Sequence, residues 1–260
     1  MEVSLSSLGK NLLSPKSNGA SKQANKYTTP KAASASASAS EKIEIRVCTN
    51  QTCRRQGSMD VFQVLSGIAP PYVTVKSCGC LGKCGAGPNI VILPEAVFVG
   101  HCGIPSKAAD TMSYVCGVDD VNSGKICLEA LSLRTRAEDD MGRGDFSHAN
   151  SLLSKAIDLK PFGGVHIIYK DRSTARLAMG DITGALEDAK EALIIAPYYP
   201  EASVLAYICE GDVLMAMDKF DAAKESFSIA LELDPSIRRA KSFKARITKL
   251  QEKLTPPNLG

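Results

Sequence analysis

The feature that most restricts the fold is a repeated pattern in the second half of the chain. Small alanines recur as Ala149, Ala185 and Ala223, at intervals of 36 and 38 residues. The same intervals separate Ala156, Ala192 and Ala230, and also Pro161, Pro197 and Pro235. Small residues let helices approach closely, and a proline ends a helix because it cannot continue the hydrogen-bond ladder. A repeat of this length predicts an array of stacked structural units.

These segments resemble the tetratricopeptide repeat (TPR), whose nominal unit is 34 residues. The additional residues fit between repeats, at Phe162-Gly163-Gly164 and Tyr198-Tyr199-Pro200. The segments depart from the family at Arg136-Ala137 and Arg172-Ser173, where Leu-Gly is typical. The resemblance implies an all-α TPR solenoid over residues 128–254, with three repeats and a capping helix.

A TPR solenoid implies a concave groove that binds a peptide or helix of a protein partner. Family members that bind chaperone tails hold a C-terminal carboxylate with Lys, Asn and Arg side chains of the first helix of each pair. The corresponding positions here hold Arg134, Glu138, Asp171, Leu205 and Cys209. Because the two acids would repel a carboxylate, we predict a protein partner that is not a chaperone tail.

The first half of the chain carries a second signal, in four of its nine cysteines. They form the pairs Cys48-x4-Cys53 and Cys80-x3-Cys84, separated by 26 residues, and each pair follows a predicted strand. The odd cysteine count and the tight clustering argue against a disulfide framework. Thiolates on two short loops can instead surround a binuclear iron centre. A structural zinc site is the competing interpretation, because zinc also favours closely spaced cysteines.

The stretch Cys80-Leu81-Gly82-Lys83-Cys84-Gly85-Ala86-Gly87-Pro88 resembles the C-L-G-x-C-x-x-G-P motif of the thioredoxin-like [2Fe–2S] ferredoxin family. The resemblance covers about residues 43–117. It implies that Cys48, Cys53, Cys80 and Cys84 are the ligands of a [2Fe–2S] cluster. Cys78 stays open as a fifth candidate, although a small, partly buried residue is the simpler interpretation.

Residues 42–118 have the pattern of a small α/β domain. Alternating polar and apolar residues predict strands, and apolar residues at helical spacing predict helices. The predicted strands cover 42–47, 72–76, 89–93 and 96–99, and the predicted helices cover 56–67 and 106–115, the second with Ser106 as its cap. This β-α-β-β-β-α order fits the thioredoxin-like fold that the resemblance implies. Residues 119–127 are predicted to be a linker, so we expect an α+β domain followed by an all-α domain.

Residues 1–41 are rich in Ser, Lys and Ala and end in an Ala-Ser run. Residues 1–40 contain five Lys, no Arg and one acid. A Ser-rich, acid-poor stretch of this kind predicts an organelle transit peptide, and the absence of Arg favours a plastid over a mitochondrion. A disordered cytosolic tail is the alternative. We therefore expect a plant plastid protein of the chloroplast stroma, with attachment to the thylakoid through a partner left open.

The remaining charge and composition exclude several classes of function. The formal net charge is +3, but residues 41–260 sum to −1, which gives no electrostatic footprint for nucleic acid. No apolar run approaches the roughly 18 residues of a membrane span, and no nucleophile–base pair or phosphate loop indicates an enzyme.

The expected function is that of a plastid iron–sulfur protein. It would use its [2Fe–2S] cluster for electron transfer or redox sensing and its TPR groove for a protein partner. The alternative is a partner-binding assembly or chaperone-like adaptor, in which the cysteine site is structural and holds a cluster or zinc.

Overall fold

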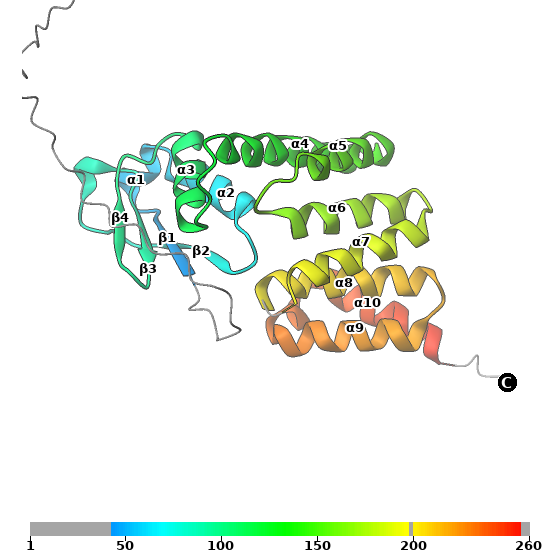
Figure 1. The fold of residues 1–260 in the computed structure, drawn as a ribbon. Helices are drawn as coiled ribbons and strands as arrows, with labels where there is room; N and C mark the ends of the chain where they lie inside the picture. The colour runs from blue at the N-terminus through cyan, green and yellow to red at the C-terminus, as the bar shows by residue number, and fades with distance from the viewer. Residues whose placement is uncertain (1–42, 198–199, 256–260) are drawn as a thin grey trace, which may run out of the picture. The chain divides into compact units, whose positions relative to one another are not determined.

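The computed structural model describes residues 43–197 and 200–255, which are mostly helical (Figure 1). The predicted transit peptide, residues 1–41, lies outside the described residues and stays a prediction. The described residues belong to one compact unit. A small sheet lies in its N-terminal part, and an array of paired helices follows.

The sheet has the order β2-β1-β3-β4. β1 and β2 are parallel, which requires a crossover between them, whereas β3 is antiparallel to both β1 and β4. The strands are β1 (Ile43–Cys48), β2 (Val73–Cys78), β3 (Ile90–Leu93) and β4 (Val97–Val99). Ile45, Val47 and Ile90 are fully buried, together with residues of the helices α2 (Ser58–Ile68) and α3 (Pro105–Val115). The strands predicted from alternation are therefore present, with ends that differ by one or two residues.

Two details of this part differ from the sequence prediction. A short helix, α1 (Gln51–Arg55), precedes α2 and carries Cys53. Helix α3 begins at Pro105 with Ile104 as its N-cap, so Ser106 lies inside the helix and is not its cap. Proline is well suited to the first helical position, where its missing N–H leaves no bond unmade.

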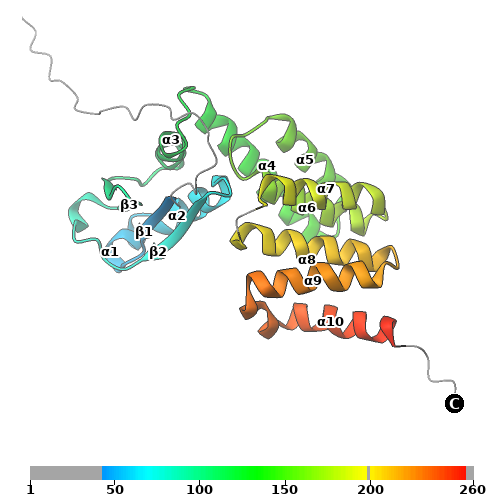
Figure 2. The same ribbon diagram turned by 60° about the horizontal axis from the view of Figure 1, so that its bottom comes forward.

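The helical part consists of three helix pairs and a final helix (Figures 1 and 2). The pairs are α4 (Ser123–Arg143) with α5 (Phe146–Asp158), α6 (Val165–Ala178) with α7 (Ile182–Ile195), and α8 (Pro200–Ala216) with α9 (Phe220–Leu233). The short helix η2 (Pro235–Arg239) leads to α10 (Lys241–Leu254). Ala149, Ala185 and Ala223 are fully buried, as their predicted role in close helix packing requires. This confirms the TPR-like arrangement predicted from the repeat.

The Gly-Asp pairs form the turn between the two helices of a repeat. Gly144 has a φ of 85°, a conformation that glycine adopts without steric cost. The next residue, Asp145, accepts a hydrogen bond from the His148 N–H and so caps α5. Asp181 caps α7 through the Gly184 N–H in the same way.

The linker predicted over residues 119–127 is replaced from Ser123 onward by the first turns of α4. The 21 residues of this helix give it a length of about 31 Å. Its Cys127 is buried in the core of the sheet part, whereas Ala130 and Ala137 are buried among the repeat helices. One continuous helix thus belongs to both cores.

The residues inserted after the first repeat contact the sheet part directly. The Gly164 N–H donates to the Ala69 carbonyl at 3.1 Å, and Arg134 Nη1 donates to the Gly67 carbonyl at 3.3 Å. A methyl group on Gly163 would overlap the Ile68 carbonyl. The two glycines therefore permit a close backbone approach between the loop before α6 and the end of α2.

Candidate functional site

The first helices of the pairs meet along one face of the helical array. Arg134 of α4 lies 3.8 Å from Asp171 of α6, measured from Nε to Oδ2. Arg246 of α10 donates from Nε to both carboxylate oxygens of Asp212 in α8, at 2.7 and 2.8 Å. Asp212 and Arg246 are 34 residues apart, so this contact follows the repeat interval. We call this surface, marked by Arg134, Asp171, Leu205, Asp212 and Arg246, the A-helix face.

At the α4 end of the A-helix face, each cation already has an acidic partner. Arg134 Nε lies 3.2 Å from Glu138 Oε1, in addition to its contact with Asp171. Lys170 Nζ lies 2.6 Å from Asp171 Oδ1. A peptide carboxylate would have to displace these acids. That the groove does not bind a chaperone tail stays a prediction.

Two uncharged residues, Leu205 and Cys209, lie in the middle of the A-helix face. Leu205 is 53% exposed. Cys209, one turn further along α8, is buried, and its Sγ lies 3.2 Å from the Ser173 hydroxyl oxygen. Burial raises the pKa of the Cys209 thiol, so this group is neutral at pH 7. Two of the five predicted groove residues therefore present no charge to a ligand.

His166 lies at the start of α6 and is buried. Within residues 43–197 and 200–255, its Nδ1 has no hydrogen-bond partner. Burial lowers the pKa of His166 to about 4, and the positive charges of Arg134 and Lys170 act in the same direction. In an unfolded chain the pKa of a histidine is about 6.5.

This difference predicts a loss of stability in acid. Between pH 6.5 and 4 the unfolded chain binds more protons than the folded chain, so the free energy of unfolding falls as the pH is lowered. The expected contribution of His166 is about 2 kcal/mol between pH 7 and pH 5. Urea unfolding of the wild type and of His166→Gln at both pH values measures it. The variant should lose this part of the pH dependence, whereas His101→Gln, at an exposed histidine, should keep it.

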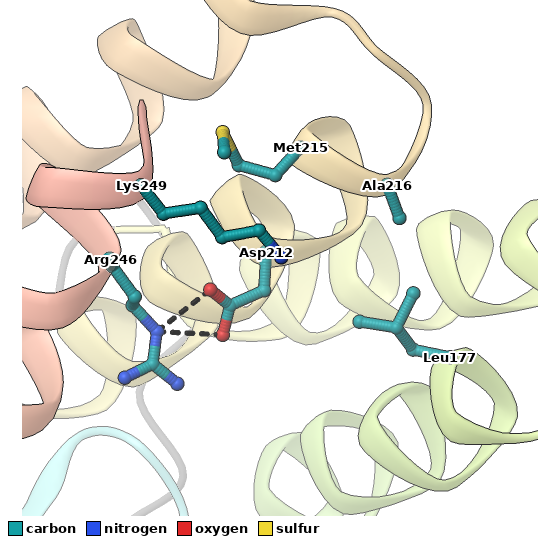
Figure 3. Close-up of a pocket in the computed structure, with 6 residues that line it drawn as sticks. All are labelled: Leu177, Asp212, Met215, Ala216, Arg246 and Lys249. Carbon is teal, nitrogen blue, oxygen red and sulfur yellow. Dashed lines mark hydrogen bonds and ion pairs between the residues drawn. The ribbon is translucent and has the colours of Figure 1, made fainter. Parts of the chain in front are cut away.

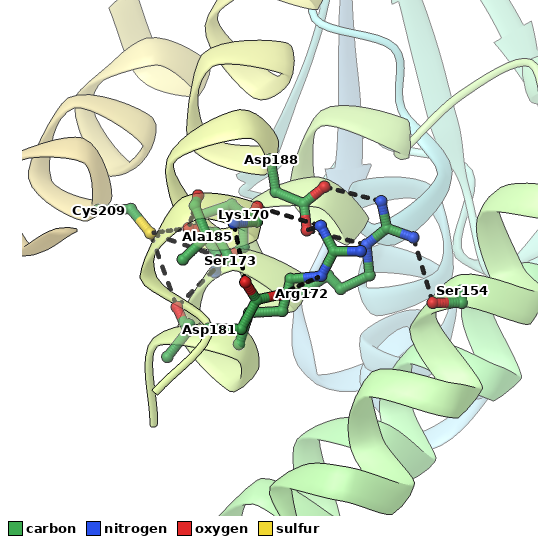
Figure 4. Close-up of polar contacts among 11 residues, drawn as sticks. Ser154, Lys170, Arg172, Ser173, Asp181, Ala185, Asp188 and Cys209 are labelled. Atoms are coloured by element: carbon green, nitrogen blue, oxygen red, sulfur yellow. Dashed lines mark hydrogen bonds and ion pairs between the residues drawn. The ribbon is translucent and has the colours of Figure 1, made fainter. Parts of the chain in front are cut away.

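A buried ionic network joins the first two repeats (Figure 4). Arg172 donates from Nη2 and Nε to the two carboxylate oxygens of Asp188, at 2.7 and 2.9 Å. Arg176 Nη1 lies 3.0 Å from the same carboxylate, and Arg172 Nη1 donates to the Ser154 hydroxyl. The network ties α5, α6 and α7 together. Arg172 and the following Ser173 stand where the tetratricopeptide repeat typically has Leu-Gly.

A cavity of about 400 Å³ lies at the opposite end of the A-helix face, between α6, α8 and α10 (Figure 3). Its lining residues are Leu177, Asp212, Met215, Ala216, Arg246 and Lys249. The sequence reasoning did not identify this cavity. The 34-residue spacing of Asp212 and Arg246 was the available signal, because equivalent residues of neighbouring repeats lie side by side.

The structure brings the four predicted cysteine ligands into one region. Cys48 and Cys53 are buried, whereas Cys80 and Cys84 are exposed. The Sγ atoms of Cys80 and Cys84 are 3.6 Å apart. The hydrogen bond and charge of Cys80 raise the pKa of Cys84, and burial and the charge of Cys48 add to this shift, so these three thiols lie within electrostatic reach of one another. Burial raises the pKa of Cys53, and Cys48 and the charge of Cys84 act in the same direction.

Several N–H groups point at these sulfur atoms. The Gly82 N–H donates to Cys80 Sγ at 3.4 Å, and the Asn89 side-chain amide donates to Cys53 Sγ at 3.8 Å. Burial opposes ionisation of Cys48, but the backbone N–H groups of Asn50 and Leu81 hold the pKa of its thiol below the ordinary value. Donors of this kind stabilise thiolates, which are the form that binds metal.

The close approach of the Gly87 backbone to Cys53 is a second observation that fits a metal-binding site. A Cβ atom on Gly87 would lie 3.1 Å from Cys53 Sγ and would overlap the Gln56 side chain. Two thiolates bound tetrahedrally to one metal are about 3.8 Å apart, close to the separation of Cys80 and Cys84. No three His, Cys, Asp or Glu side chains in the described part of the chain are arranged to hold a single ion. The ligand assignment stays a prediction.

The sequence reasoning missed one residue of this region and left another undecided. Asn89 is fully buried, and its amide bridges Cys53 Sγ and the Lys83 carbonyl. Its position directly after Gly87-Pro88 was the available signal. Cys78 is half-buried at the end of β2, where it pairs with Cys48 in the sheet register. Burial and the charge of Cys48 raise the pKa of Cys78.

Among the residues that the structure describes, none of the helices is both long enough and apolar enough to span a membrane.

No protein-family model matches the chain. Over 92 residues, the chain is 32% identical to the protein STIP1 homolog of Dictyostelium discoideum. The aligned region covers 35% of this chain and 15% of that protein. It is 29% identical over 108 residues to small glutamine-rich tetratricopeptide repeat-containing protein 2 of Mycosarcoma maydis. That alignment covers 42% of this chain and 29% of the relative. The chain thus spans less than a third of the length of these curated relatives.

Among solved structures, the first TPR of Spaghetti (RPAP3) bound to the HSP90 peptide SRMEEVD aligns with 49% of this chain and 94% of that one. The sequence identity is 21% and the TM-score is 0.42. The curated relative of Mycosarcoma maydis is named as a tetratricopeptide repeat protein, which agrees with the helix pairs observed here.

Proposed function

We propose that this protein is a binding adaptor that holds a peptide segment of a partner protein against the A-helix face. The observation that carries the proposal is the exposed Leu205 in the middle of that face, between helices joined by contacts at the repeat interval. A leucine this exposed leaves apolar surface that a partner can bury, which favours binding. Sequence similarity to TPR proteins supports the same class of function.

The proposal predicts that Leu205→Glu strongly weakens partner capture. A leucine buried by a partner contributes roughly 1.5–3 kcal/mol, so its loss should weaken binding about 10- to 100-fold. The measurement is affinity purification with the full chain, followed by titration of the purified partner.

The matched control is Ile194→Glu, which makes the same kind of change at an exposed residue of α7, the second helix of its pair. Circular dichroism of both variants should match the wild type. Equal losses of partners in the two variants, or no loss in either, would contradict the assignment of binding to the A-helix face.

We also propose that residues 42–118 are a thioredoxin-like domain with a [2Fe–2S] cluster held by Cys48, Cys53, Cys80 and Cys84. The parallel β1–β2 pair with two antiparallel strands supports the fold assignment. The short Cys80–Cys84 separation, the N–H donors and the close approach at Gly87 support the ligand set. When bound, such a cluster supplies one-electron chemistry.

The protein's own residues would set the properties of that site. Gly82 and Asn89 would hydrogen-bond the ligand sulfurs, and such bonds tune iron–sulfur sites. Lys83 lies over the Phe98 ring at 4.1 Å, which keeps its ammonium group beside the ligand loop. The alternative, an adaptor with a purely structural cysteine site, agrees more closely with the relatives identified by sequence. The proposed compartment is the plastid, which an import assay on residues 1–41 would test.

A further inference from the structure

The cavity between α6, α8 and α10 contains nitrogen donors without a protein acceptor. Arg246 uses Nε to bind Asp212, and Figure 3 shows its terminal nitrogens pointing away from that carboxylate. Within residues 43–197 and 200–255, both side-chain hydrogen bonds of Arg246 come from Nε, and Lys249 Nζ makes no hydrogen bond or ion pair. Asp212 thus fixes the guanidinium in place while its outer edge stays available. A pre-oriented guanidinium edge suits a carboxylate, which it can bind through two parallel N–H groups.

Apolar groups form the other wall of the same cavity. Leu177 comes from α6, and Met215 and Ala216 come from the end of α8 (Figure 3). A methionine side chain adapts to differently shaped ligands because it is unbranched and flexible. A volume of about 400 Å³ is sufficient for one apolar side chain and a neighbouring acidic one.

The charge distribution selects an acidic ligand. Residues 235–254 contain seven Lys or Arg and one Glu, a net charge of +6, whereas residues 41–234 sum to −7. At the cavity itself, Arg246 and Lys249 face a single acid, Asp212. The field at this end of the A-helix face is therefore positive, in contrast to the neutralised α4 end.

The apolar side of α10 is already covered, which argues against a membrane as the ligand. Phe243 and Leu250 are 3% exposed and pack with Phe227 of α9. A helix that lies in a bilayer interface needs a free apolar face. A peptide segment with an acidic and an apolar side chain matches both walls of the cavity.

From these observations we infer that the cavity binds a partner segment in which an acidic residue adjoins a medium-sized apolar residue. The carboxylate contacts Arg246 and Lys249, and the apolar side chain contacts Leu177 and Met215. This inference rests on the proposed adaptor function and specifies the chemistry of its partner.

The test measures fluorescence anisotropy of the full chain with short, labelled, C-terminally amidated peptides in which two Glu flank Leu, Met, Val or Phe. Matched peptides replace both Glu by Gln, or the apolar residue by Ser. We expect each replacement to weaken the best peptide at least 10-fold. No preference for Glu over Gln would overturn the inference. If the peptide with Ser in place of the apolar residue binds as tightly as the best peptide, or if heparin does, the contact is a general one with polyanions, and the inference is also overturned.

Two variants of α10 locate the site. Lys249→Glu should weaken the peptide at least 10-fold, whereas Lys244→Glu, the same change at an exposed residue of the same helix that does not line the cavity, should weaken it less than 3-fold. Equal effects of the two variants would overturn the inference. If Leu205→Glu abolishes peptide binding while Lys249→Glu leaves it intact, the adaptor function stands and the cavity assignment fails. If binding survives both variants, both proposals fail.

Discussion

Replacing Cys84 by alanine should abolish the visible absorption of the protein purified without oxygen. The wild type should contain about two iron atoms and two acid-labile sulfides per chain, as a [2Fe–2S] cluster requires, and the variant close to none. The physical reason is that Cys84 lies within electrostatic reach of Cys48 and Cys53, and its Sγ lies 3.6 Å from that of Cys80. Absorbance spectra with iron and sulfide analysis measure the effect.

Two further cysteine variants make this result specific. Cys116→Ser changes a half-buried thiol at the end of α3 and should leave the spectrum unchanged. Cys78→Ala should also retain the cluster, because Cys78 is held in the sheet opposite Cys48 and is not one of the predicted ligands. Loss of absorbance in Cys78→Ala would contradict the four-cysteine assignment. A colourless wild-type protein with about one zinc per chain would establish the zinc alternative instead.

Asp188→Asn should destabilise the protein by about 3 kcal/mol. Asp188 is 2% exposed, and its carboxylate binds two arginines, Arg172 and Arg176. Removing one partner of a buried ionic network costs roughly 3–5 kcal/mol, because the remaining charges stay buried without compensation. For a chain of this size the expected drop in the thermal midpoint is about 6–12 °C, which differential scanning calorimetry measures.

The neighbouring residue provides the control for this prediction. Glu187→Gln removes one negative charge from an exposed position of the same helix, α7, and should change the stability by less than about 0.5 kcal/mol. If Asp188→Asn and Glu187→Gln have equally small effects, the network does not hold the first two repeats together.

The sequence allowed the helical part to be predicted because its information is local and repeated. Each repeat must place small residues at the helix contacts and a turn between its helices, so Ala149 and its equivalents recur at a visible interval. The same reasoning predicted the strands of the sheet, whose alternation follows from one buried face. The linker assigned to residues 119–127 was less accurate, because the first turns of α4 bury Cys127 against residues far away in the sequence.

The sequence by itself therefore determined the repeat, the position of the helix pairs and the two cysteine loops, since each depends on residues close together in the chain. Only the tertiary structure decided how these parts combine: the contact of Gly163 with Ile68, the neutralisation of Arg134, and the free guanidinium edge of Arg246 beside Lys249. The physical reason is that each of these features depends on the distance between groups on different elements. Hydrophobic periodicity shows which face of an element is buried, but not which side chain lies opposite it.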